Sequence, residues 1–272
     1  MNRPLRFATL LLIGLAPSLA AATITNLSDW TLAEDPPNTA MSGMIDSPTQ
    51  ATLEAAGSVP SGTDIGFQSV DGPSVAASTG GYYFSPASDF SVAIDYNLSA
   101  VASSGGGGIG LGIGEDRAGV NSAGVGLAFI NGLPTLLATA ARIDNDDEPI
   151  ASFGTPMGFG RFFVSYDSAS GDITAGFSGT PGAATPDTTS VIAGIQDQWD
   201  DEPLLVSFFL RSQEFSLAPT LPSVPPLSGT SVTAVFSNFE VLSGTPVPVI
   251  PEPAAIVLAL CGACVLGHAR GW

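Results

Sequence analysis

The sequence has no lysine, only one histidine and only two cysteines among its 272 residues. Seven arginines stand against 25 aspartate and glutamate residues, which gives a formal net charge of −18. Nucleic-acid binding needs clustered lysine and arginine side chains to neutralise phosphates. The composition therefore excludes a nucleic-acid partner and indicates an acidic surface.

The histidine and both cysteines lie near the C-terminal end, at His268, Cys261 and Cys264. A Ser-His-Asp or Cys-His catalytic site therefore cannot form in the longer part of the chain that precedes them. The two cysteines have the spacing of a thiol motif, but they lie within an apolar run. Small residues that pack in lipid explain them better than redox chemistry does.

The N-terminal residues have the three parts of a secretory signal peptide. Two arginines precede an apolar run from Phe7 to Ala16, and small residues follow it. The run is too short for a spanning helix, which needs about 20 residues. We expect residues 1–22 to be a signal peptide and the mature chain to begin at Ala21 or Thr23.

The C-terminal residues are Pro251, Glu252 and Pro253, then an apolar run, then a single arginine before the end. In this order and position they resemble the PEP-CTERM sorting signal of bacteria with exopolysaccharide-rich envelopes. The resemblance implies that a membrane processing enzyme of the exosortase type reads the Pro-Glu-Pro motif and removes the tail. The chain departs from the family at Ala254, where serine or threonine is usual, and in its single arginine. A membrane anchor that is not processed is the alternative.

Between these ends, apolar and polar residues alternate, as in antiparallel strands that bury one face. The alternation is clearest at residues 90–98, 162–166, 173–177, 204–210 and 232–236. It slips near Ser237, which predicts a β-bulge. Turn sequences such as Asn131-Gly132 separate the runs.

These patterns predict four segments. Residues 1–22 form the signal peptide, and residues 23–244 form one all-β domain, an antiparallel β-sandwich or jelly roll. Residues 245–253 form a proline-rich stalk, and residues 254–272 form a transmembrane sorting tail.

One expected strand has glycine along one side, because Ile109, Leu111 and Ile113 alternate with glycines. The segment from Gly124 to Phe129 repeats the pattern. Glycine weakens a strand unless its bare side lies close to another backbone or to a ligand. We therefore expect such a close approach on this face.

The strand order, the segment from Arg161 to Thr174 and the closing strand from Ser231 to Val241 resemble the concanavalin A-like lectin/laminin-G sandwich superfamily. The resemblance implies a lectin-like module that binds carbohydrate on the cell surface. It also implies a calcium site, since such sites are common in laminin-G-like relatives.

An acidic run in an expected loop supplies candidate calcium ligands, which are Asp144, Asp146, Asp147 and Glu148. Calcium binds several hard oxygen ligands, and alternate residues of a loop can converge on one ion. The run lacks the EF-hand spacing. A solvated acidic turn explains the same residues without a metal.

A second acidic loop contains Asp197, Trp199 and Asp200. An exposed tryptophan beside carboxylates could stack on a sugar while polar groups hold its hydroxyls. The alternative is that Trp199 faces the core, and the usual burial of large aromatic side chains favours it.

Three functions remain open: a surface module that binds envelope polysaccharide, a structural matrix protein without a ligand site, and a glycan-active hydrolase or lyase. A glycosidase needs two carboxylates close together. Asp95, Glu214 and Glu240 each stand singly in their expected strands, so a pair would have to come from separate strands. We therefore expect a binding module and not an enzyme.

Overall fold

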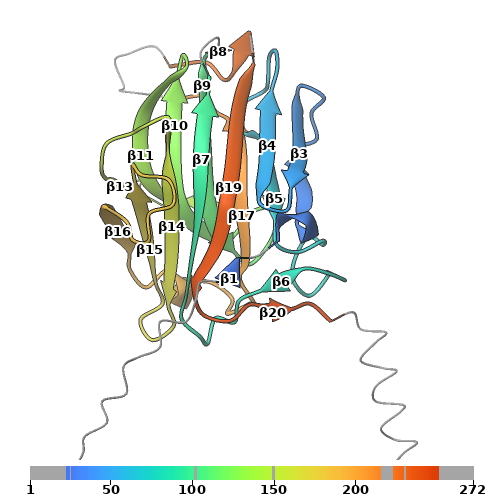
Figure 1. The fold of residues 1–272 in the computed structure, drawn as a ribbon, viewed down its shortest axis with the longest axis vertical. Helices are drawn as coiled ribbons and strands as arrows, with labels where there is room; N and C mark the ends of the chain where they lie inside the picture. Colours follow the sequence, from blue (N-terminus) through green and yellow to red (C-terminus); the bar gives the residue numbers. More distant parts are fainter. Residues whose placement is uncertain are drawn as a thin grey trace, which may run out of the picture.

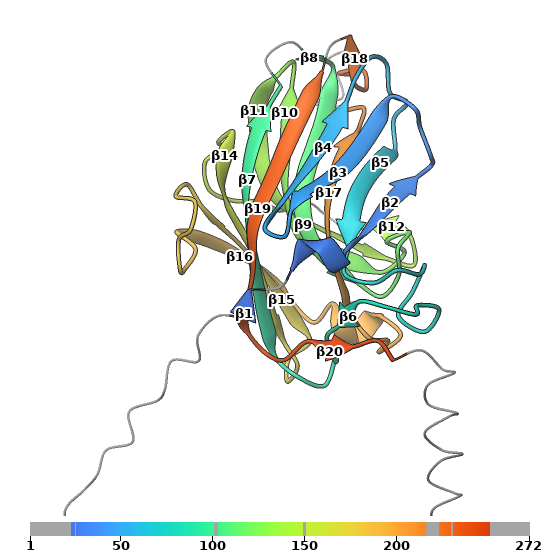
Figure 2. The ribbon, with the colours of Figure 1, turned by 45° about the vertical axis from the view of Figure 1, so that its right-hand side comes forward.

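The computed structural model describes residues 23–24, 26–100, 103–148, 151–215, 223–229 and 231–250. Within these ranges the only helices are two short 3-10 helices, η1 (Leu27–Asp29) and η2 (Gln196–Gln198). Two eight-stranded antiparallel sheets, A and B, pack face to face (Figures 1 and 2). The predicted all-β antiparallel sandwich is confirmed.

Sheet A has the order β16-β15-β14-β7-β19-β4-β3, and β1 pairs with β19. Its strands are β1 (Thr23–Ile24), β3 (Met41–Ser47), β4 (Gln50–Ala55), β7 (Phe90–Ser99), β14 (Phe159–Asp167), β15 (Asp172–Ser178), β16 (Thr188–Ile192) and β19 (Val232–Ser243). The register of β19 against β7 shifts between Ser237 and Glu240, which confirms the predicted bulge.

Sheet B has the order β12-β11-β10-β9-β17-β5-β2, and β13 pairs with β11. Its strands are β2 (Thr31–Asp35), β5 (Thr63–Gln68), β9 (Gly106–Gly114), β10 (Ser122–Ile130), β11 (Leu133–Ile143), β12 (Asp146–Asp147), β13 (Ala151–Ser152) and β17 (Leu205–Ser212). The turn at Asn131-Gly132 joins β10 to β11, as its sequence predicts.

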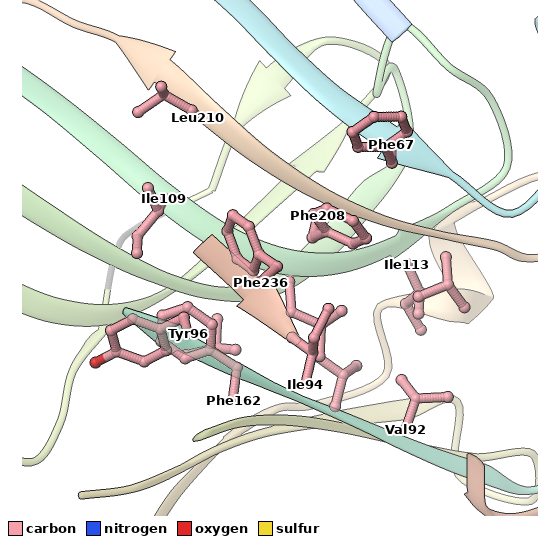
Figure 3. Packing of buried hydrophobic residues seen from close by; sticks show 14 of the residues in the cluster. Phe67, Val92, Ile94, Tyr96, Ile109, Ile113, Phe162, Phe208, Leu210 and Phe236 are labelled. Carbon is pink, nitrogen blue, oxygen red and sulfur yellow. The ribbon is translucent and has the colours of Figure 1, made fainter. Parts of the chain in front are cut away.

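The core lies between the sheets and is built from the alternating apolar residues of both. Val92, Ile94 and Tyr96 face it from β7, while Phe208 and Leu210 face it from β17 (Figure 3). Because these side chains point inward, their neighbours along each strand form the outer faces of the sandwich.

The folded domain continues beyond its expected end at residue 244. β20 (Val247–Pro248) pairs with β6 (Tyr82–Tyr83), and Val249 packs with Val70, Val75 and Leu205. Another small pair, β8 (Ser103–Ser104) with β18 (Ser228–Gly229), lies at the opposite end of the sandwich (Figures 1 and 2). The first part of the expected stalk is therefore held against the domain.

No helix in the described ranges is long and apolar enough to cross a membrane. The expected signal peptide (1–22), the sorting motif Pro251-Glu252-Pro253 and the expected tail (254–272) all lie outside those ranges. These three assignments stay predictions.

Candidate functional site

The outer face of sheet B is lined by glycine. Ile109, Leu111 and Ile113 of β9 point into the core, so the glycines between them point outward. Across the sheet, glycines of β9 and β10 stand opposite each other in register, as Gly110 does to Gly126. We call this surface the glycine face, and its residues are Asp64, Gly66, Gly108, Gly110, Gly112, Gly124, Gly126, Ser207, Phe209 and Arg211.

Phe209 is the aromatic residue of the glycine face. On β17 it stands in register between Gly66 of β5 and Gly110 of β9. A Cβ atom at Gly110 would lie 2.8 Å from the Phe209 Cζ, so the ring rests directly on the glycine backbone. The side chain is only partly buried, which leaves aromatic surface exposed to solvent.

Other glycines of this face remain open to solvent. A Cβ atom at Gly108 or Gly126 would come no closer than 3.7 Å to any neighbouring atom. The expected close approach is therefore seen at Gly110, where an aromatic ring lies on the backbone, but not at Gly108 and Gly126, where the backbone stays accessible.

Next to Phe209, Arg211 stands opposite Asp64 in the register of β17 and β5. The Arg211 Nε lies 3.6 Å from the Asp64 Oδ2, which is an ion pair but too long for a hydrogen bond. Among the described residues, neither side chain makes a hydrogen bond, and the Arg211 Nε is buried. The buried Arg211 Nε is closed to a ligand, but each side chain is 32% exposed, so the Asp64 carboxylate and the rest of the guanidinium keep hydrogen-bonding capacity beside the ring.

Burial raises the pKa of Asp64 to about 6, against the positive charge of Arg211, which lowers it. Asp35, the register partner of Asp64 on β2, raises this pKa further, and Arg142 and Arg117 lower it. Asp64 thus combines a raised pKa with a specific charge partner, Arg211, on a side chain that is 32% exposed.

The connection between β9 and β10 closes one end of this region. Arg142 of β11 donates from Nη1 to the Gly119 carbonyl at 3.5 Å, and Arg117 donates from Nη2 to the Leu32 carbonyl of β2 at 3.3 Å. A cleft of about 500 Å³ lies here, lined by Glu34, Asp35, Pro73, Ser74, Asp116, Arg117 and Ala118. Three of the four described arginines are thus near the glycine face.

The candidate calcium ligands lie in a turn after β11. Asp144 has a positive φ of 53°, while Asp146 and Asp147 form the short strand β12. Asp147 accepts a hydrogen bond of 2.8 Å from the Arg142 Nε, and Glu148 is the remaining candidate. Among the described residues, no three acidic, histidine or cysteine side chains come together as metal ligands. Calcium binding by this turn stays a prediction.

The structure corrects the interpretation of Trp199 as a stacking surface for sugar. Its side chain is only 6% exposed and belongs to the main core, and its Nε1 donates to the Arg142 carbonyl at 3.1 Å. Asp197 and Asp200 stay exposed on the surface beside it. A ring buried among apolar neighbours offers no face to a ligand, so the alternative that it faces the core holds.

On sheet A, the structure joins two carboxylates that the sequence shows only singly. Arg161 of β14, which is 1% exposed, donates to Asp95 of β7 at 3.3 Å and to Glu240 of β19 at 2.5 Å. Asp95 also accepts from Asn238 and from the Gly182 backbone, each at 2.9 Å. Only the strand register brings these residues together, so no spacing along the chain predicts the cluster.

No family model and no curated protein matches the chain. Among solved structures it is similar to the carbohydrate recognition domain of Emp46p, at 8% identity and a TM-score of 0.43, over 80% of this chain and 90% of that one. Peanut lectin matches at 12% identity and a TM-score of 0.37, over 76% and 97% of the two chains. An endo-1,3-beta-glucanase from Streptomyces sioyaensis matches at 10% identity and a TM-score of 0.40, over 79% and 92%. At these identities and TM-scores, the three likenesses carry no argument about a site or an activity of this chain.

Proposed function

We propose that this chain is a carbohydrate-binding module of the bacterial cell surface or extracellular matrix, and that the glycine face is its binding surface. The observation that carries the proposal is the Phe209 ring on Gly110, next to an Asp64–Arg211 pair whose hydrogen-bonding capacity is unused within the described residues.

A sugar ring has an apolar face and a polar edge, and the glycine face offers a partner for each. The flat apolar surface of Phe209 suits the face of the ring. A sugar hydroxyl at the solvent-exposed edge of the pair would donate to the Asp64 carboxylate and accept from the exposed part of the Arg211 guanidinium, since each side chain is 32% exposed. Open backbone at Gly108 lets the rest of the ligand lie close to the sheet.

The cellular setting rests on the sequence. The expected signal peptide places the domain outside the cytoplasm. The expected sorting tail supplies a transient membrane anchor and makes an exosortase-type enzyme a processing partner. Envelope polysaccharide is then the carbohydrate that the domain meets at highest local concentration.

A glycan-active hydrolase is the second candidate, because two carboxylates stand on neighbouring strands. Asp35 is the register partner of Asp64, whose pKa is raised to about 6. A glycosidase needs one protonated and one ionised carboxyl group near the scissile bond. Release of new reducing ends from a polysaccharide, lost in Asp64→Asn, would favour this candidate over simple binding.

The deciding experiment is retention of the purified protein on a glycan array and on polysaccharide from the host envelope, with calcium and with EDTA. We expect retention, and we expect Phe209→Ala to weaken it about tenfold, or ~1.4 kcal/mol. Phe159→Ala is the matched control, because Phe159 is an exposed phenylalanine on sheet A. Equal loss in both variants would contradict the assignment of the site, and no retention at all would favour a structural matrix protein.

A further inference from the structure

A second cleft, of about 270 Å³, lies on the outer face of sheet A, on the opposite side of the sandwich from the glycine face. Six hydroxyl side chains line it, and they are Ser91, Ser165, Thr174, Thr185, Thr189 and Ser243. Phe163 and Pro186 supply apolar surface, and none of the lining residues is charged. The volume corresponds to about nine water molecules.

Two of the hydroxyl groups in the cleft form a hydrogen-bonded pair. The Ser91 and Ser165 Oγ atoms lie 2.8 Å apart, across β7 and β14. A hydroxyl both donates and accepts, so such a pair keeps capacity for further partners. This chemistry suits a neutral polyhydroxylated ligand and offers no counter-charge to an ionic one.

One wall of the cleft is the connection between β15 and β16, residues 179–187. Pro186 in this wall lies against Gly176, where a Cβ atom would come within 2.9 Å of the proline. Asp187 accepts from the Ser178 Oγ at 2.7 Å and from the Gly179 backbone at 3.2 Å, which fixes both ends of the connection.

The buried Arg161 cluster holds the middle of the same wall. Asp95, paired with Arg161, accepts the Gly182 backbone N–H at 2.9 Å. A buried ion pair contributes little net stability compared with apolar packing, and its best-attested use is to fix one arrangement. The Arg161 guanidinium also lies 5.7 Å from the ring of Phe163 in the cleft. The cluster therefore positions the wall beside the cleft before any ligand arrives.

We propose that this cleft is a second saccharide-binding site, which takes an uncharged sugar unit, and that one domain thereby cross-links two polysaccharide chains. The inference rests on the proposed function for the class of ligand, but it concerns a different surface. Two sites on opposite faces of a single domain would join polymer strands without oligomerisation.

The test is titration of the isotope-labelled protein with laminarihexaose, cellohexaose and maltohexaose, followed by amide NMR. We expect one of these neutral oligosaccharides to shift the amides of Ser165 and Thr174 in the cleft, and separately those of Ser207 and Arg211 on the glycine face. Thr174→Tyr fills the cleft and should abolish only the first set. Thr233→Tyr is the matched control, a partly buried threonine on the outer face of β19 away from the cleft.

The outcomes separate the two proposals. Shifts on the glycine face alone overturn the second site and leave the proposed function intact. Shifts in the cleft alone overturn both the glycine face as the binding surface and the cross-linking. No shift on either face overturns binding of neutral glycans altogether. Turbidity with long laminarin gives an independent reading, and we expect it to fall at least tenfold in Thr174→Tyr and in Phe209→Ala, but not in Thr233→Tyr.

Discussion

The ring of Phe209 lies on the backbone of Gly110, its register partner on the neighbouring strand, so that a Cβ atom there would be 2.8 Å from the ring. The same Cβ atom would lie 2.6 Å from the Val125 carbonyl oxygen, which cannot move without disturbing β10. The position of the ring therefore depends on the absence of a side chain at Gly110.

Replacing Gly110 by alanine should displace Phe209 and destabilise the fold by roughly 1–3 kcal/mol through overpacking. Saccharide retention should fall with it. In the matched variant Gly108→Ala, the new methyl group meets no atom within 3.4 Å, so we expect a change within about 0.5 kcal/mol. Urea denaturation of both variants measures the difference, and equal stabilities would contradict the packing seen at Gly110.

The raised pKa of Asp64 should make the stability of the fold depend on pH. Its pKa is raised in the folded state from 3.8 to about 6, so the folded protein binds this proton more tightly than the unfolded chain does. The group therefore favours folding at low pH, and this contribution is lost as the pH rises from about 4 to about 6. Relative to Asp64→Asn, the wild type should lose roughly 1–2 kcal/mol over that range, after allowance for solvent screening.

Asp89 is a control, because its effect on the pH dependence of stability should have the opposite sign. Hydrogen bonds from the Ser168 side chain and backbone lower the pKa of Asp89. Its contribution is present at neutral pH and is lost as the pH falls through the lowered value. Thermal melts from pH 3 to pH 8 should show Asp64→Asn and Asp89→Asn departing from the wild type in opposite directions. A parallel departure would contradict the assigned environments.

Removing the guanidinium of Arg161 should be among the most damaging single changes in the domain. Arg161→Met leaves Asp95 and Glu240 without their counter-charge at a site where the arginine is 1% exposed. Breaking such a buried pair costs about 3–5 kcal/mol. Arg142→Met, at a surface ion pair with Asp147, should cost less than about 1 kcal/mol. Comparable losses in the two variants would show that the cluster is not buried as described.

Trp199→Phe tests whether the tryptophan belongs to the core or to a ligand site. The variant loses the hydrogen bond from Nε1 to the Arg142 carbonyl and some apolar contact, so stability should fall by about 1–2 kcal/mol. Retention on polysaccharide should not change. Loss of retention with unchanged stability would restore Trp199 as a ligand-binding residue.

The sandwich is largely readable from the sequence, because alternation fixes which side of each strand is buried. Residues 90–98 fall in β7 and residues 204–210 almost wholly in β17, and the alternating residues Val206, Phe208 and Leu210 lie in the core as predicted. The glycines that alternate with apolar residues in β9 also predict that another group packs closely against that face of the strand. Asp64 and Arg211 could not be paired in advance, since more than half the chain separates them and only the register of β5 against β17 joins them. Trp199 was ambiguous because an acidic loop sequence does not reveal that its tryptophan turns inward.

The small strands β1 and β20 lie at the same end of the sandwich, opposite β8 (Figure 1). If the domain were attached to a surface through either end of the described chain, its long strands would run away from that surface. The outer faces of sheets A and B would then both be parallel to the strands and away from the attachment surface. Two polymer chains could each contact one of these faces without entering the space between the domain and that surface.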